Sequence, residues 1–214
     1  MRRRSLLPLL LSGGAAAWWA GPALGQSYEQ FFRALDIDNV DGLRSLLARG
    51  FDPNTADERG QRPLYLALRG GSFKVAELLL EHPQTRIDAV NAVGETALMM
   101  AALKGQVDWM QRLLERGARP DQEGWTPLHY AATGPEPRAV SLLLDRGVRI
   151  DAVSPNGSTS LMMATQYGPE ESVALLLQRG ADAAPRNHRG ETAADVARRV
   201  GRDALVDRLT RAIR

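Results

Sequence analysis

The sequence contains no cysteine, and Lys74 and Lys104 are its two lysines. The absence of cysteine excludes a disulfide framework, a thiolate zinc site, a cysteine nucleophile and the cysteine-linked lipid anchor of bacterial proteins. Of the 214 residues, 44% are hydrophobic and 24% are charged, which is typical of a globular protein. This composition excludes a disordered or collagen-like chain.

Catalytic motifs are also missing. The three histidines, His82, His129 and His188, fall in different segments of the chain, so we do not expect them to converge on a metal ion or a reacting atom. The sequence has no glycine-rich phosphate loop, no cluster of residues at metal-ligand spacing and no nucleophile elbow. We therefore expect a protein that is not an enzyme, with no catalytic residue, no metal and no cofactor.

Residues 1–25 have the pattern of a secretory signal peptide. Three arginines at positions 2–4 precede an apolar run, which ends at the small residues Ala23 and Gly25. The pattern predicts cleavage after Gly25, a mature protein that starts at Gln26, and a location in the periplasm or outside the cell. Both the general secretory route and the twin-arginine route stay open. An uncleaved membrane anchor is the alternative, because the apolar run is nearly long enough to span a bilayer.

Cleavage would also change the charge of the protein. The formal charge falls from +2 to −1, because residues 1–25 hold three arginines and no acidic residue. A nearly neutral body has no general attraction for phosphate backbones or anionic lipids. We therefore expect no nucleic-acid partner, and contact with a membrane only transiently during export.

Two glycine motifs recur along the rest of the chain. The first is a glycine that stands two residues before a short motif such as Thr126-Pro127-Leu128-His129, and it occurs at Gly60, Gly94, Gly124, Gly157 and Gly190. The second closes a Leu-Leu-x-Arg-Gly motif at Gly50, Gly117, Gly147 and Gly180. Both series recur at nearly equal intervals and alternate along the chain. Because they keep a constant phase, they predict one repeated structural unit.

The fourth unit allows its local structure to be predicted. Thr126 is placed as a helix N-cap, with Pro127 in the first helical position, where a missing N–H is tolerated. A second helix then ends at Gly147, which we expect in a left-handed conformation. A pair of helices cannot bury its apolar face alone, so the units are expected to stack on one another.

Thr126-Pro127-Leu128-His129, followed by Ala131, resembles the signature of the ankyrin repeat family. The family's repeat of about 33 residues also matches the intervals between the glycines. The resemblance, to a small exported bacterial member of that family, implies an all-α solenoid of stacked helix-turn-helix units joined by β-hairpin-like fingers. About six repeats are expected, including caps: an N-terminal capping repeat over 26–56, four central repeats over 57–186 and a C-terminal capping repeat over 187–214. His129 belongs to the signature, so the resemblance implies a structural role for it.

Two intervals depart from the repeat. Gly117 and Gly124 lie three positions closer together than the corresponding glycines of other units, which are Gly50 and Gly60, Gly147 and Gly157, and Gly180 and Gly190. The shorter interval predicts a short finger and a local notch between repeats three and four. Repeat two lacks its closing glycine and has residues 81–85 in its place, which predicts an exit without a left-handed glycine cap.

The resemblance implies that a partner protein binds to the concave face, which is made of the finger tips and the ends of the first helices. On these positions we expect the partner-binding residues Arg59, Arg69, Val93, Leu103, Lys104, Trp125, Gln166, Tyr167, His188 and Arg189. Aromatic residues beside cations are typical of an interaction hot spot. The alternative is that Trp125 folds back over the short finger and Tyr167 packs on Met163, which would leave no patch.

These observations favour a monomeric, non-catalytic module that binds an unidentified partner protein as an adaptor, inhibitor or stabiliser. One alternative is an accessory or cofactor-handling protein that supports an exported enzyme, for example in peroxide detoxification, through His188, Tyr167 or the paired methionines. The other alternative is a membrane-tethered scaffold that retains residues 1–25.

Overall fold

The computed structural model describes residues 21–213, and only the backbone of residues 21–24. These residues form twelve helices and no strand. The helices are α1 (Gly21–Asp36), α2 (Val40–Ala48), α3 (Pro63–Gly70), α4 (Phe73–Glu81), α5 (Ala97–Leu103), α6 (Val107–Glu115), α7 (Pro127–Thr133), α8 (Pro137–Asp145), α9 (Ser160–Tyr167), α10 (Glu170–Gln178), α11 (Ala193–Arg199) and α12 (Asp203–Ala212).

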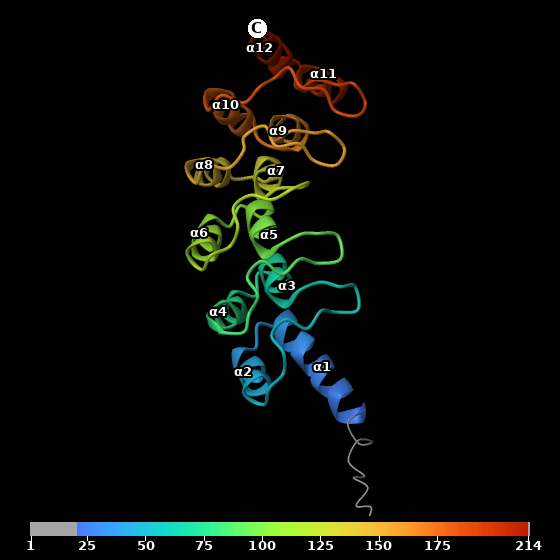
Figure 1. Cartoon of the computed structure of the whole chain (residues 1–214), viewed down its shortest axis with the longest axis vertical. Coiled ribbons are helices and arrows are strands. Elements are labelled where there is room, and N and C mark those ends of the chain that lie inside the picture. Colours follow the sequence, from blue (N-terminus) through green and yellow to red (C-terminus); the bar gives the residue numbers. More distant parts are fainter. Residues whose placement is uncertain (1–20, 214) are drawn as a thin grey trace, which may run out of the picture.

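The helices form six antiparallel pairs that stack along the long axis of the molecule (Figure 1). The odd-numbered helices form one column, the even-numbered helices form a second column, and the fingers project on the side of the odd-numbered helices (Figure 1). Neighbouring helices of the first column pack directly, as α5 does on α7 and α7 on α9. The predicted all-α solenoid of six units is therefore confirmed.

Four fingers have the tip of a hairpin without paired strands. In the last of them, the Asn187 N–H donates to the Glu191 carbonyl at 3.0 Å, and the Gly190 N–H donates back to the Asn187 carbonyl at 2.8 Å. Gly190 has a φ of 74°, which favours glycine over residues with a side chain. The same pair of bonds closes the fingers at 57–61, 91–95 and 154–158.

The helix ends follow the expected local rules. The Thr126 hydroxyl accepts a hydrogen bond from the His129 N–H, and Pro127 is the first residue of α7. Gly147, after α8, has a φ of 74°, so the predicted left-handed residue is confirmed. The exit of repeat two is also as predicted, since α4 ends at an extended His82 with a φ of −68° and a ψ of 127°.

One continuous apolar core runs through the stack. In repeat four, Leu128, Val140 and Leu143 are fully buried, and Ala131 and Ala132 allow the helices to approach closely. Burial of each such leucine contributes about 1.5–3 kcal/mol to stability. Because most of this burial lies between helices, each repeat depends on its neighbours for stability.

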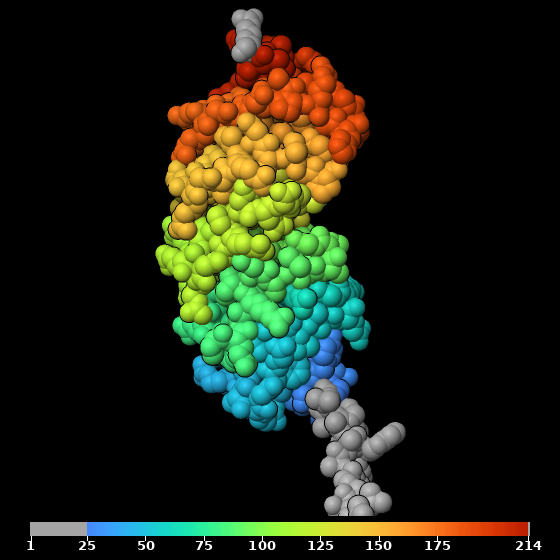
Figure 2. All heavy atoms as spheres, viewed as in Figure 1, coloured from blue at the N-terminus to red at the C-terminus, as the bar shows by residue number. Residues whose placement is uncertain are grey.

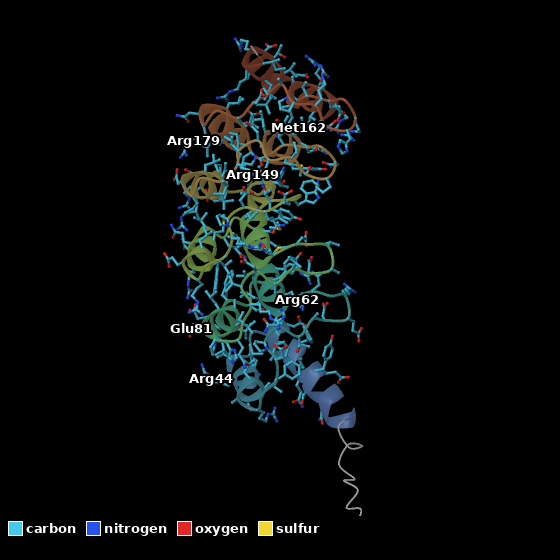
Figure 3. All side chains as sticks on the ribbon, in the orientation of Figure 1. Arg44, Arg62, Glu81, Arg149, Met162 and Arg179 are labelled. Atoms are coloured by element: carbon cyan, nitrogen blue, oxygen red, sulfur yellow. The ribbon has the colours of Figure 1, made fainter. Side chains whose placement is uncertain are left out.

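Polar side chains join the bases of consecutive fingers. The Asp88 carboxylate accepts from the Arg119 N–H at 3.0 Å, and Asp151 accepts from the Asp182 N–H at 3.0 Å. At the N-terminal end, Arg62 spans two fingers by donating to the Val90 carbonyl at 2.8 Å. Arg62 lies toward the fingers in Figure 3, whereas Arg179 lies on the side of the even-numbered helices. These bonds fix the distance between repeats.

The expected signal peptide falls mainly outside the described residues. Residues 1–20 are not described, and α1 begins at Gly21 and continues past the expected cleavage point at Gly25. Cleavage therefore stays a prediction, as do the domain boundaries that depend on it. Between residues 21 and 213, no helix combines the length and hydropathy that crossing a membrane requires.

Candidate functional site

The finger between repeats three and four is shorter than the others and is built differently (Figure 1). Asp121 lies four residues after Gly117 and three residues before Gly124. In the full-length fingers, these two positions relative to the glycines are held by two different residues. Its carboxylate accepts from Arg149 Nε at 2.7 Å, and the Gln122 side chain donates to the Trp125 carbonyl at 2.9 Å. These side-chain bonds hold the short finger in place.

An apolar hollow of about 250 Å³ opens beside the short finger. Its walls come from α5, α7, α9 and the residue that follows the finger glycine, and they are Leu103, Trp125, His129, Tyr130, Thr133 and Met163. The outline of the molecule is indented on the finger side between its green and orange parts (Figure 2). The predicted notch is therefore present, and its floor is apolar.

A more polar cleft of about 490 Å³ adjoins the apolar hollow. Trp125 and Met163 line both spaces, so the two lie side by side. The cleft brings together Trp125, Asn156, Ser158, Met163, Gln166, Tyr167, Asn187, His188 and Arg189. We call the hollow and the cleft together the concave-face groove.

His129 forms part of the floor of the groove and is fully buried. Its Nδ1 lies 2.8 Å from the Thr126 hydroxyl, and its Nε2 lies 3.0 Å from the Ser158 carbonyl. Because a carbonyl only accepts, the proton of the neutral ring is assigned to Nε2. Burial lowers the pKa of His129. These bonds join repeat four to the next finger, as the structural role implied for His129 requires.

Trp125 and Tyr167 show features of both arrangements expected from the sequence, the binding patch and the folded-back alternative. Trp125 is half-buried, and its ring meets those of His129 and Tyr130 edge-on, with centroid distances of 5.4 and 6.5 Å. Trp125 therefore folds back over the short finger, as the alternative predicts, yet it still lines both parts of the groove. Tyr167 is 60% exposed, and its hydroxyl accepts from Gln166 Nε2 at 2.6 Å.

One carboxylate organises the C-terminal rim of the groove. Glu191 accepts hydrogen bonds from Asn187 Nδ2 at 2.9 Å, from Arg189 Nε at 2.9 Å and from Arg199 Nε at 2.7 Å. These bonds, with that from Asn187 the strongest, lower the pKa of Glu191 to about 2. Two arginines thus share one carboxylate, which leaves positive charge at this end of the groove.

The structure brings six of the ten predicted residues together. Leu103, Trp125, Gln166, Tyr167, His188 and Arg189 line the groove. The other four lie on earlier repeats and line neither part of it: Arg59, Arg69, Val93 and Lys104. All four are exposed, and Val93 is 71% exposed. Their role in binding, like that of the six, stays a prediction.

Sequence reasoning missed a cluster of two tyrosines and a glutamate next to the groove. The Tyr65 hydroxyl donates to Glu95 Oε2 at 2.7 Å, and the Tyr130 hydroxyl donates to Glu95 Oε1 at 2.8 Å. Although burial acts to raise it, the pKa of Glu95 is lowered by these bonds and by one from Asn91. A glutamate directly after the finger glycine, repeated at Glu191, was the signal in the sequence.

A second missed feature lies on the even-numbered helices. Phe73 of α4 stacks on Trp109 of α6 with ring centroids 5.7 Å apart, and the Arg112 guanidinium lies 4.6 Å from the Trp109 centroid. Arg112 also pairs with Glu77. A hollow of about 520 Å³ adjoins these residues. We call Phe73, Glu77, Trp109 and Arg112 the back-face cluster.

The part of the chain that the structure describes contains no set of metal ligands. Within residues 21–213, no three or more histidine, aspartate or glutamate side chains are grouped so as to hold an ion. The groove offers apolar contact, hydrogen bonding and positive charge.

Comparison with known proteins agrees with this architecture. The family model described as "Ankyrin repeats (3 copies)" matches residues 31–123 and 110–187. A chain in the solved complex of the predatory endopeptidase Bd0816 from Bdellovibrio bacteriovorus with the immunity protein Bd3460 is similar at a TM-score of 0.73 and 26% identity. The likeness covers 86% of this chain and 97% of that chain.

Curated relatives share the repeats but are much longer. The human SH3 and multiple ankyrin repeat domains protein 2 is 34% identical over 159 residues, which are 72% of this chain and 9% of that protein. The mouse B-cell lymphoma 3 protein homolog is 32% identical over 165 residues, which are 74% of this chain and 37% of that protein. Since the family model covers most of the chain, the protein belongs to the ankyrin repeat family, whose arrays serve as protein–protein interaction modules.

Proposed function

We propose that the protein is a monomeric, non-catalytic module that binds a partner protein through the concave-face groove. The observation that carries the proposal is the groove itself, in which an apolar hollow and a polar cleft share Trp125 and Met163. Hot spots of interfaces are rich in tryptophan, tyrosine and arginine set in pockets, and the groove offers Trp125, Tyr167 and Arg189.

The groove is also preorganised. Trp125 is held by its ring contacts with His129 and Tyr130, and Arg189 is held by Glu191. Side chains that are already fixed lose less conformational entropy when a partner binds. Trp125 and Arg189 are therefore suited to direct contact with a partner.

The similar solved complex guides the choice of partner. That structure is described as a predatory endopeptidase in complex with an immunity protein. By analogy, we propose an exported peptidase, restrained by this chain, as the first partner to test. The alternative is that the chain stabilises another exported enzyme, such as one that removes peroxide. Identification of the partner recovered by affinity capture distinguishes the two.

The location is proposed from the sequence. Three arginines followed by an apolar run and the small residues Ala23 and Gly25 support export to the periplasm or beyond. Amino-terminal sequencing of the protein from the exported fraction is expected to begin at Gln26. A membrane-bound product that retains residues 1–25 would instead support the tethered scaffold.

Affinity capture from the native exported fraction tests the binding function. The wild type is compared with the double variant Trp125→Ala, Tyr167→Ala, and Phe73→Ala in the back-face cluster is the matched control. Circular dichroism verifies that each variant is folded. We expect wild type and Phe73→Ala to recover the same partner and the double variant to lose it. Recovery by the folded double variant at the wild-type level would contradict a role for the groove.

A further inference from the structure

We infer that the concave-face groove receives a protruding loop of the partner, which places one apolar side chain in the apolar hollow and an acidic residue beside it at the Arg189 rim. The inference rests on the proposed function and adds the chemistry of the partner. Three features of the groove support it: the apolar lining of the hollow, the short finger, and the charge of the rim.

Three of the polar side chains that line the apolar hollow already have hydrogen-bond partners. Both ring nitrogens of His129 are bonded, the Tyr130 hydroxyl donates to Glu95, and the Thr133 hydroxyl donates to the His129 carbonyl at 2.9 Å. A polar group placed against these three side chains would lose its water without gaining a hydrogen bond, which costs free energy. An apolar side chain, in contrast, gains from burial against Leu103, Trp125 and Met163.

The apolar hollow is small and lies at one place along the stack. Its volume is about 250 Å³. The hollow opens where the finger is three residues short, and the next finger, at 154–158, is closed by the usual pair of hydrogen bonds. An occupant must therefore reach past a full-length finger, as a protruding loop does and a flat surface does not.

Positive charge lies at the C-terminal rim of the groove. Arg189 and Arg199 share the single carboxylate of Glu191, with N–O distances of 2.7 Å each. Lys104, which lines neither part of the groove but directly follows Leu103, is exposed and has no ion pair within the residues that the structure describes. The pKa of Arg149 is raised by Asp121 and also by the charge of Glu123, the exposed acid of the short finger. An acidic residue of the partner therefore finds complementary charge at the rim.

The probe is a phage-displayed library of nine-residue loops, each closed by a disulfide, selected on the purified protein. We expect the enriched loops to share one large apolar residue with an aspartate or glutamate within two positions of it. Thr133→Met places a longer side chain in the hollow and is expected to raise the Kd of these loops about tenfold or more, and Arg189→Glu about three- to tenfold.

Matched controls separate these effects from altered folding. Arg138→Glu removes an arginine that pairs with a glutamate two residues away, as Arg189 does, but on α8. Thr210→Met adds the same bulk as Thr133→Met at an exposed position of α12. Both controls are expected to leave the Kd within about twofold of the wild-type value, and thermal unfolding verifies that all four variants are folded.

The possible results are distinct. Loops that lose binding to Tyr167→Ala but share no apolar residue, or carry basic residues instead, would overturn the inference and leave the proposed function standing. Failure of any loop to enrich would also overturn it. Loops that bind the Trp125→Ala, Tyr167→Ala variant as tightly as the wild type would count against both the inference and the groove.

Discussion

The Tyr130 hydroxyl donates a hydrogen bond to Glu95 Oε1 at 2.8 Å, and this bond joins repeat four to the finger of repeat three. Tyr65 of repeat two donates to the other oxygen of the same carboxylate at 2.7 Å. One side chain thus connects three consecutive repeats. Since Tyr130 also lines the apolar hollow, the bond fixes one wall of the concave-face groove.

Glu95→Ala is expected to lower the free energy of unfolding by about 1–3 kcal/mol. The reason is that the hydroxyls of Tyr65 and Tyr130 lose their acceptor, and an unsatisfied polar group of this kind carries a cost of about 1–3 kcal/mol. Urea denaturation followed by circular dichroism measures the change. Glu58→Ala, at an exposed finger position, is the control and is expected to change stability by less than about 0.5 kcal/mol. Equal stability of the two variants would contradict a stabilising role for the cluster.

Gly168→Ala is expected to destabilise the stack by about 1–3 kcal/mol or more. A Cβ at this position would lie 2.1 Å from the Ala132 carbonyl oxygen of the preceding repeat, so the two repeats would have to separate. Thermal and urea unfolding measure the effect.

Gly70→Ala is the matched control for Gly168→Ala. Gly70 is helical, and a Cβ there would come no closer than 3.6 Å to the Ser72 hydroxyl. Alanine is the better helix former, so this variant is expected to be unchanged or more stable by up to about 1 kcal/mol. Destabilisation of both variants to the same extent would mean that the contact with Ala132 is not the cause.

The stability that Glu191 contributes is expected to depend on pH. Its pKa is about 2 in the folded protein and near the ordinary value of 4.5 in the unfolded chain. Because the folded pKa is the lower one, the contribution is fully present above about pH 4.5 and is lost as the pH falls toward 2. Urea denaturation of wild type and Glu191→Gln between about pH 7 and pH 3 measures it. A difference in stability that stays constant over this range would contradict the prediction.

Comparison with Glu191→Gln is needed because other carboxyl groups titrate in the same range. Hydrogen bonds also lower the pKa of Glu95 and Asp121, in each case against the effect of burial. The wild type alone reports the sum of these groups, whereas the difference between wild type and variant reports Glu191.

Local rules explain what the sequence could predict. The Thr126 cap, Pro127 at the start of α7 and the left-handed Gly147 each depend on a few neighbouring residues, and all three are present. The short finger was also readable, because it is a difference in spacing. The side of the stack that carries the predicted groove residues followed from their position in the repeat.

Local rules of this kind do not predict the contacts between repeats. The Tyr65–Glu95 bond joins the first helix of repeat two to the finger of repeat three, and the Phe73–Trp109 stacking joins the second helices of the same two repeats. Whether such side chains meet depends on the distance and rotation between neighbouring repeats, which the spacing of motifs does not specify. For the same reason, the sequence could not show that Trp125 both packs on His129 and lines the groove.

Lengthening the short finger is expected to remove binding without loss of the fold. Three residues inserted between Asp121 and Gln122 restore the interval found in the full-length fingers, so a full-length finger would cover the apolar hollow. A loop extension of this size has a small entropic cost, well below about 1 kcal/mol. Partner capture and circular dichroism measure the two effects. The same insertion between Glu58 and Arg59, at an exposed finger tip, is the control and is expected to retain the partner. If the lengthened finger also retains the partner at the wild-type level, the apolar hollow is not where the partner binds, because a covered hollow cannot receive a side chain.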